Sequence, residues 1–579
     1  MFKRFLKYFT ITALLLGVTL SSLPFIIPLD NYRSILEAKL SQSVGRKVMV
    51  GEISPQILPL PALTATNVSL LSSPDHPGEI FVKTVQATLD PLALLKGEIL
   101  ISSIHLNGVG SDLAFINALI QPKKTIPPVH AKSTLLAIHK ITATNVMLRT
   151  DHHTSLGPYR FDLRLDDRFN CKEISLSRMD NTLQAVLKPA PNNSYELQAS
   201  GSHWYIPVSP SLKFETLSVK AIIQRGKAEL TDVKIDGYDG QLTTHGTLSW
   251  GDQWQYDGQL KSTHIQMAPL LKHFDINRYD GRFYSNLKIK LKGENLGDLF
   301  INPEATGSYH ITHGTVKNEH SHKAWLEFDE FSANAQLTKG ALINENNTLK
   351  TSGGTIQGIT HLFWGKEWAI NGWVVASEID AEKFLSGFVD DKVTSGHFYA
   401  AAEFNLTASE DESLLDRPYI TGDFRMTNGR IFKADLEKAS TTLSSKGSDG
   451  GETPFQRLTG KVTFENNHVN VSDIDIMSDS INARGEININ PQQELRGEIT
   501  VALRKTASII SAPLKVSGSV RDPSLRLTND AIIGGVIGTS VLGAGLGTAV
   551  GMKVGRIIKN IASTFGSGEA KADLISSHK

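Results

Sequence analysis

The sequence predicts a mostly β protein with three parts: an N-terminal transmembrane helix, an elongated, repetitive and curled antiparallel β-sheet that forms a groove, and a Gly-rich hydrophobic C-terminal segment. Three observations support this prediction. Strand-like alternation of apolar and polar residues recurs along the chain, blocks of sequence repeat internally, and both ends carry long uncharged apolar stretches. Repetition on this scale is typical of stacked, elongated folds rather than of a globule built around one active site.

The clearest repeat covers a turn and the strands on either side of it. Residues 265–291 resemble residues 379–406, with one residue inserted at the turn, and both copies place Gly-x-Phe-Tyr before the second strand. The match continues from GSYHITHG at 307–314 to GDFRMTNG at 422–429. Shorter similar segments start at Thr231, Ser472 and Gly358. We therefore expect equivalent strands and turns in the two long copies.

Composition excludes several classes of function. The chain has 579 residues, too many for one compact core, so several domains or an extended repeat array are expected. Lys+Arg and Asp+Glu both number 59, and this balance argues against a nucleic-acid partner, which requires a basic face. The single cysteine, Cys171, cannot form a disulfide within the chain.

The N-terminus carries the first membrane signal. Residues 9–29 contain no charged side chain, close to the ~20 residues that span a bilayer core. Lys3, Arg4 and Lys7 precede this stretch, so the N-terminus is expected in the cytoplasm and the bulk of a single-pass protein on the far side. A cleaved signal peptide is the alternative, although Thr19-Leu20-Ser21 is a weak cleavage site. Residues 30–43 have helical spacing and predict a short helix after the membrane.

A second uncharged stretch, residues 531–552, lies near the C-terminus and is rich in glycine. The predicted packing face of this segment consists of Gly543, Gly547 and Gly551. Three cations follow at Lys553, Arg556 and Lys559, as in a helix at a membrane interface. Because each glycine costs about 1 kcal/mol in an exposed helix, a flexible or β-packed segment in water is the alternative.

Between the two ends, strands recur in a set form, a glycine followed by alternation with a period of two. Some 30 strands spaced at ~4.8 Å would extend over roughly 140 Å. The clearest strands predict one apolar face that contacts lipid acyl chains. Its candidate residues are Phe424, Met426, Val462, Phe464, Ile474, Ile476, Ile487, Ile489, Ile499, Val501 and Leu503. Since helices are scarce, the sheet must curl, close, or hold something apolar. The alternative is a solenoid whose apolar face packs shut.

Catalytic and metal motifs are missing. The sequence has no G-x-S-x-G, H-E-x-x-H, P-loop, C-x-x-C or G-x-G-x-x-G motif. The best metal candidates are the histidines at 310, 313, 320 and 322, which are better explained as exposed strand and loop residues. Asp473, Asp475 and Asp479 are better explained as a solvated polar face than as acid–base groups. We expect no enzymatic activity, no cofactor and no metal.

Several segments also carry a family resemblance. VGRKVMVGEISPQILPLPALTATNVSLLSS and PLALLKGEILISSIHLNGV resemble the N-terminal module of the AsmA family. LKIKLKGENLGDL, ITGDFRMTNGRI, VSDIDIMSDSINARGEININ and LKVSGSVRDPSLRL resemble its C-terminal region. The resemblance implies a bacterial envelope protein, anchored in the inner membrane, with a periplasmic β-groove related to TamB and other bridge-like lipid transporters.

The implied function is movement of phospholipid toward the outer membrane, in support of outer-membrane homeostasis. The implied partners are phospholipids, the inner membrane, and the outer membrane or an outer-membrane protein. The alternative is a non-enzymatic assembly or scaffold factor for outer-membrane protein biogenesis. The expected divisions are an anchor at 1–29, an AsmA-like N-terminal module at 30–120, a linker at 121–134, a repetitive β-groove region at 135–528 (its AsmA-like C-terminal region from about 265), a Gly-rich segment at 529–562 and a disordered tail at 563–579.

Overall fold

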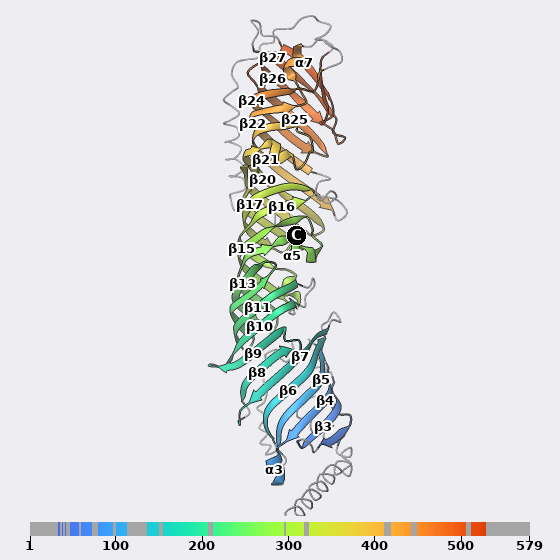
Figure 1. Ribbon diagram of the computed structural model, residues 1–579, viewed down its shortest axis with the longest axis vertical. Helices are drawn as coiled ribbons and strands as arrows, with labels where there is room; N and C mark the ends of the chain where they lie inside the picture. The colour runs from blue at the N-terminus through green and yellow to red at the C-terminus, as the bar shows by residue number, and fades with distance from the viewer. Residues whose placement is uncertain are drawn as a thin grey trace, which may run out of the picture. The chain divides into compact units, whose positions relative to one another are not determined.

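The computed structural model is mostly β (Figure 1). It describes residues 33–34, 37–38, 41, 47–56, 60–71, 79–96, 100–112, 136–149, 155–168, 170–206, 212–294, 297–317, 323–409, 418–441, 448–504 and 511–528. The chain forms two compact units. Unit 1 comprises residues 1–260 and 290–301, and unit 2 comprises residues 261–289 and 302–579. The strands β14 (Trp254–Gln266) and β15 (Tyr279–Gly293) carry the chain from one unit to the other.

In unit 1, most strands pair with the strand next to them in the sequence. Both β1 and β2 pair with β3. The strands are β1 (Val48–Met49), β2 (Ile53–Gln56), β3 (Ala62–Leu70), β4 (Ile80–Leu89), β5 (Ile101–Asp112), β6 (Leu136–Arg149), β7 (Ser155–Leu165), β8 (Cys171–Arg178), β9 (Leu183–Ala190), β10 (Ser194–Ile206), β11 (Leu212–Gln224), β12 (Lys227–Gly237) and β13 (Gly240–Ser249).

One pairing in unit 1 departs from the predicted antiparallel sheet. Strands β5 and β6 are parallel, with Leu106 opposite Ala143. Parallel neighbours require a connection of a dozen or more residues, and residues 113–135 provide it. The segment that the sequence marks as a linker, residues 121–134, lies within this connection.

In unit 2, strands β16 to β22 pair in sequence order and antiparallel, and β22 then pairs with β24. The order continues through β29. The strands are β16 (Glu304–Lys317), β17 (Ala324–Thr338), β18 (Ala341–Thr351), β19 (Gly354–Phe363), β20 (Glu367–Asp380), β21 (Thr394–Ser409), β22 (Pro418–Phe432), β23 (Ser448–Asp449), β24 (Glu452–Glu465), β25 (His468–Met477), β26 (Ile481–Ile489), β27 (Leu495–Leu503), β28 (Ser511–Gly518) and β29 (Pro523–Leu527).

The internal repeat is visible in the backbone. His313 and Asn428, which occupy equivalent positions of the two copies, have φ values of 51° and 52°. Three residues before the helix in each copy, His264 and Glu378 both have φ 59°. Left-handed residues at these strand positions are typical of β-bulges, which bend a strand and increase its twist. The two copies therefore share their irregularities as well as their strands.

The helices in the described part of the chain are short: α3 (Pro91–Leu95), α5 (Met267–Leu271), η3 (Lys272–Phe274), η4 (Gly297–Phe300), α6 (Ala381–Leu385) and α7 (Leu436–Thr441). Residues 91–95 form one helical turn capped by Asp90. None of the helices within the described ranges has the length and apolar character needed to cross a bilayer. The predicted anchor at residues 9–29 and the glycine-rich segment at 531–552 lie outside those ranges.

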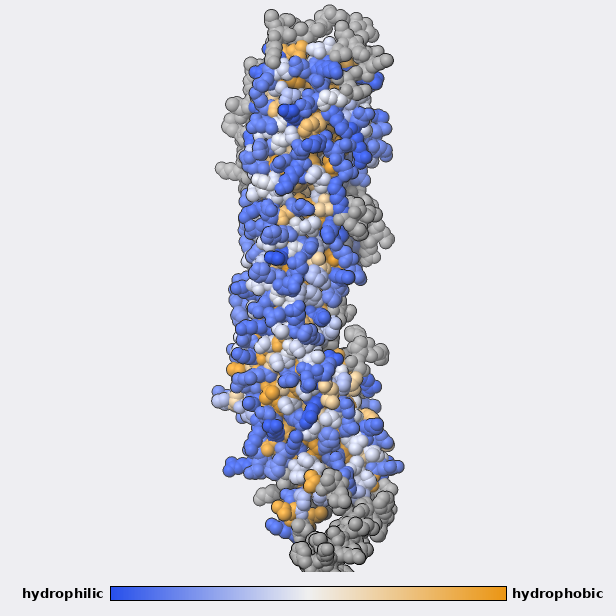
Figure 2. Space-filling model, in the orientation of Figure 1, coloured by the Kyte–Doolittle hydropathy of each residue, from blue (hydrophilic) through white to orange (hydrophobic). Residues whose placement is uncertain are grey.

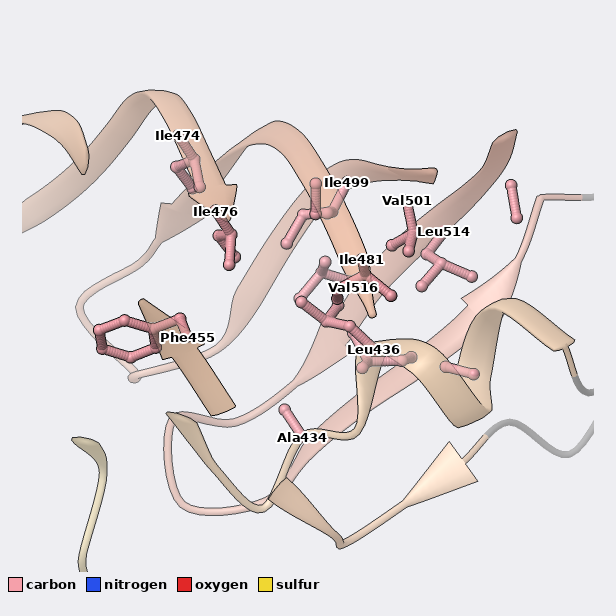
Figure 3. Close-up of a cluster of buried hydrophobic side chains, with 14 of the residues drawn as sticks. Ala434, Leu436, Phe455, Ile474, Ile476, Ile481, Ile499, Val501, Leu514 and Val516 are labelled. Atoms are coloured by element: carbon pink, nitrogen blue, oxygen red, sulfur yellow. The ribbon is translucent and has the colours of Figure 1, made fainter. Parts of the chain in front are cut away.

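The last strands of unit 2 curl back on themselves. Strand β29 pairs with β23, the short strand that lies between β22 and β24 in the sequence, with Ser448 opposite Leu525. The helix α7 packs against β24, β27, β28 and β29. Figure 3 shows side chains from α7 and from β24, β25, β26, β27 and β28 pointing toward one another in one buried cluster. The curl therefore encloses a packed core at this end of unit 2.

Candidate functional site

The pairing register of unit 2 places the apolar residues of successive strands on one face of the sheet. Because directly paired residues of neighbouring strands point to the same side, the registers define continuous rows across the strands. We name three of them. The leucine row is Leu337, Leu342, Leu362, Ile370 and Leu406. The phenylalanine row is Phe404, Ile420, Phe464, Val469 and Ile489. The core row is Met426, Leu458, Ile476, Ala483, Val501 and Ala512.

The structure brings all eleven residues predicted to contact acyl chains to this apolar face. Phe464 lies opposite Val469, which lies opposite Ile489. The remaining pairs place Phe424, Met426, Val462, Ile474, Ile476, Ile487, Ile499, Val501 and Leu503 on the same side. The alternation read from the sequence is therefore correct in phase, even across the bulge at Asp473, whose φ is 52°.

The eleven residues divide into two groups by burial. The first group belongs to the buried cluster at the C-terminal end of unit 2 and consists of Met426, Ile474, Ile476, Ile499 and Val501. Val501 is 0% exposed and touches other protein side chains on all sides, as does Leu514 at 0%. The second group is half-buried and consists of Phe424, Val462, Phe464, Ile487, Ile489 and Leu503. Within the first group, protein side chains already fill the space that a lipid would occupy.

The cluster is sealed by α7 and by the segment that leads into it. Leu436 is 2% exposed, and its backbone N–H donates a hydrogen bond of 3.0 Å to Thr453 Oγ1. That hydroxyl in turn donates to the backbone oxygen of Ala434 at 2.6 Å. Asp435 caps the helix by accepting from the Lys438 N–H at 2.8 Å. The polar groups that enter the core with α7 are therefore satisfied, and the closure costs little desolvation energy.

The middle strands, β17 to β21, differ from the C-terminal end. Every residue of the leucine row is half-buried, neither enclosed nor fully exposed. On this part of the face most of the fully buried side chains are small or polar, such as Ala333, Asn344, Asn347 and Ala376, but one large side chain, Ile379 at the end of β20, is also fully buried at 1% exposure. The phenylalanine row is half-buried throughout and continues this path into β22, β24, β25 and β26. The two rows thus form an apolar track whose large side chains keep accessible surface.

A polar cluster interrupts the track in the middle strands. The Asn347 side-chain N–H donates to Thr360 Oγ1 at 2.9 Å, and Asn344 is 8% exposed. Burial raises the pKa of Tyr309 to about 12, an effect that a hydrogen bond from the Asn344 side chain partly offsets. Tyr309 therefore stays neutral throughout the physiological range and presents a phenol to the apolar face.

The opposite face carries ion pairs. Lys350 Nζ lies 2.7 Å from Glu330 Oε2, and Lys461 Nζ lies 2.9 Å from Asp473 Oδ2. The hydrogen bond to Asp473 raises the pKa of Lys461. Asp475 contacts two arginines, Arg457 at 3.3 Å and Arg484 at 2.9 Å. Asp479 accepts from Gln456 Nε2 at 2.6 Å. The aspartates considered above for acid–base chemistry lie instead in exposed or half-exposed ion pairs and hydrogen bonds.

The histidine candidates do not converge. His310 stacks on Tyr284 with a ring-centroid distance of 4.4 Å, and His313 occupies a bulge. His320 and His322 lie outside the described residues, as do Gly543, Gly547 and Gly551. Within the described ranges, no group of three or more His, Cys, Asp or Glu side chains is arranged to bind a metal ion.

Unit 1 repeats the same face pattern. In β10 and β11 the residues on one side are exposed and mostly polar, and those on the other are mostly apolar and half-buried or buried. Leu197 lies opposite Ala221, and Ala199 opposite Val219. The described core cluster of unit 1 is small and contains Val48, Val50, Val68 and Val82. As in the middle strands of unit 2, most large side chains on this face remain half-buried.

The comparison with known proteins bears on the N-terminal part. The model of the AsmA family matches residues 2–132. The N-terminal module is AsmA-like. The match confirms the family resemblance over this segment, and the resemblance seen further along the chain stays a prediction. No curated protein and no solved structure matches the chain significantly.

Sequence reasoning did not select the leucine row as part of the site. Its strands interleave Leu and Ile with Gly, Asn and Thr, so their alternation is weaker than that of β24 to β27. The available signal was the repeated glycine on this face, such as Gly358 and Gly372, which lie opposite Val374 and Phe404. Small residues beside large half-buried ones leave space along an apolar face.

Proposed function

We propose that this protein is an envelope protein that shields phospholipid acyl chains on the apolar faces of its sheets and conducts them toward the outer membrane. Residues 9–29 anchor it in the inner membrane as a single-pass protein with a periplasmic bulk, and it has no enzymatic activity. The AsmA-like N-terminal module supports the envelope setting. The partners are phospholipids, the inner membrane, and an acceptor at the outer membrane.

One observation carries the proposal. The leucine and phenylalanine rows form an apolar track that stays half-exposed, whereas the core row at the C-terminal end is filled by protein. A half-exposed Leu or Ile leaves part of the ~1.5–3 kcal/mol that its burial can contribute unrealised. Acyl chains laid along the track would bury that surface while the polar head groups remain in water.

The test is native mass spectrometry of the full-length protein, extracted in mild detergent, for co-purified phospholipid. We compare Leu406→Glu with Asn405→Glu, two neighbours on β21 that point to opposite faces; Leu406 is half-buried and Asn405 is exposed. The proposal predicts bound phospholipid in the native protein and in Asn405→Glu, and loss of most of it in Leu406→Glu. Absence of lipid from all three proteins would contradict the proposal and favour the assembly or scaffold function instead.

A further inference from the structure

A small leucine-rich surface at one end of unit 1 has no role in the acyl-chain track. The helix α3 exposes Leu92 by 72% and Leu94 by 42%, whereas Ala93 between them is 7% exposed. The Asp90 side chain caps the helix by accepting from the Leu92 N–H at 2.8 Å and the Ala93 N–H at 3.2 Å. The Asp90 cap and the buried Ala93 hold the helix in place, so that its two exposed leucines face outward.

Two more leucines lie at the same end. The Leu89 N–H donates to the Pro61 oxygen at 2.8 Å, which places Leu60 beside the residues that lead into α3. Leu60 is 52% exposed, and Leu63, on the apolar face of β3, is 37% exposed. Figure 2 shows an apolar patch over α3 that stands out from a largely hydrophilic surface. We call Leu60, Leu92 and Leu94 the leucine tip.

The chain enters unit 1 from the side of the leucine tip. Arg33, Glu37 and Ser41 are helical. Glu37 Oε1 accepts from the Val50 N–H at 2.7 Å, and Ser41 Oγ accepts from the Val48 N–H at 2.9 Å. The helical segment therefore runs opposite to β1 and β2, so that Arg33, its first described residue, lies on the side of the end of β2.

The end of β2 is also the end of β4 that leads into α3. Gln56, the last residue of β2, pairs with Ala62, and Ala62 pairs with Thr88. Arg33 lies only four positions beyond Leu29, the end of the uncharged stretch. Four residues span at most about 14 Å even when fully extended. A membrane crossed by residues 9–29 would therefore lie close to unit 1 on the side of the leucine tip.

We propose that the leucine tip inserts into the same bilayer that residues 9–29 span, as a second membrane contact that fixes the orientation of unit 1. This inference rests on the anchor in the proposed function. The tip has the composition of an interfacial contact, because its leucines can enter the acyl region while Lys96, which follows α3, stays at the level of the head groups. The contact would place the apolar residue Leu63, at the start of β3, next to the lipids.

The test uses the full-length protein reconstituted into vesicles of phosphatidylethanolamine and phosphatidylglycerol. In a Cys171→Ser background, an environment-sensitive fluorophore is attached to Leu92→Cys. The matched control is Phe81→Cys, since Phe81 is 47% exposed but lies at the opposite end of β4. The inference predicts that the emission of the fluorophore at position 92 is shifted to the blue, and that spin-labelled acyl chains quench it while aqueous iodide does not. At position 81 the emission should stay as in water, and iodide should quench it while the acyl chains do not.

The outcomes separate this inference from the anchor itself. Resistance of the protein to alkaline extraction tests the anchor. If the protein resists extraction while the label at position 92 behaves as in water, the leucine tip does not insert and the inference is wrong. Disulfide-linked dimers through Leu92→Cys would also overturn it, because a second copy would then cover the tip. In the double variant Leu92→Glu and Leu94→Glu, a fluorophore at Leu60→Cys should become accessible to aqueous iodide. The melting temperature of the protein should not change.

Discussion

The core row and the leucine row belong to the same apolar face of unit 2 but have different surroundings. In the core row, Ile476 and Val501 are enclosed by neighbouring strands and by the cluster that α7 seals. In the leucine row, Leu362 and Ile370 keep accessible surface. The difference teaches that alternation identifies an apolar face, whereas the closure of the sheet decides whether protein or another apolar molecule covers it.

The largest effect on stability is expected when one valine in each region is replaced by aspartate. Val501→Asp buries an unpaired carboxylate at a site that is 0% exposed, and should cost on the order of 5 kcal/mol. Val374→Asp, half-buried in the middle strands, leaves its carboxylate within reach of water and should cost about 1–2 kcal/mol. Hydrogen exchange of β24 to β29 measures the first loss. Equal destabilisation by both variants would show that the middle strands are as closed as the core.

A matched deletion of methyl groups should show the same order with smaller values. Ile476→Ala, at 2% exposure, should lower the free energy of unfolding by about 2–5 kcal/mol because it leaves a cavity. Ile370→Ala lies in the leucine row, and we expect less than half of that loss in urea denaturation. Added phospholipid should stabilise the native protein against urea more than it stabilises Ile370→Ala. A lipid effect that is the same in both proteins would argue against contact at the leucine row.

Alkaline pH should act on the middle strands through Tyr309. Burial raises its pKa to about 12 from 10.0, so the folded state favours the neutral phenol. The stabilisation is complete below pH 10 and is lost as the pH rises from about 10 to about 12. It amounts to about 3 kcal/mol, since one pKa unit corresponds to 1.36 kcal/mol and the two pKa values differ by about two. Tyr309→Phe should remove this part of the pH dependence of unfolding. An unchanged profile would show that Tyr309 is not buried in solution.

The smallest effect is expected on the polar face, where the two regions should not differ. Lys461→Ala at the C-terminal end and Lys350→Ala in the middle strands each remove one exposed ion pair. Such pairs contribute about 0.2–1 kcal/mol and weaken in salt. The raised pKa of Lys461 means that its contribution is present below its usual pKa and is lost as the pH rises through the folded value. A loss above 2 kcal/mol at only one site would show that the regional difference extends beyond the apolar face.

Much of the fold was predictable because local patterns determine it. Period-two alternation gave the phase of the strands from Phe424 to Leu503, and the repeat predicted that the turns near Gly281 and Gly396 are equivalent. Both glycines have positive φ, 141° and 116°. The parallel pairing of β5 with β6 was not predictable, because it depends on the path of a long connection and not on the strands themselves.

The site was predictable only in part. The strands with the strongest alternation, such as β25 and β27, are rich in Ile and Val because they build a packed core. The sequence therefore predicted these strands best. Two of their residues, Ile474 and Val501, are nevertheless among the least accessible to a lipid. Whether a face closes depends on contacts distant in the sequence, such as Leu525 opposite Ser448, and alternation within one strand carries no record of them.

The most direct test places a photo-crosslinking amino acid at four single positions of the full-length protein in cell envelopes. Leu362 and Phe464 lie on the half-exposed track, Ile476 lies in the core row, and Lys461 lies on the polar face. Mass spectrometry of the irradiated protein then identifies adducts. Our account predicts phospholipid adducts at Leu362 and Phe464, adducts with neighbouring protein segments at Ile476, and no lipid at Lys461. Equal lipid labelling at Phe464 and Lys461, or lipid at Ile476 but not at Leu362, would contradict it.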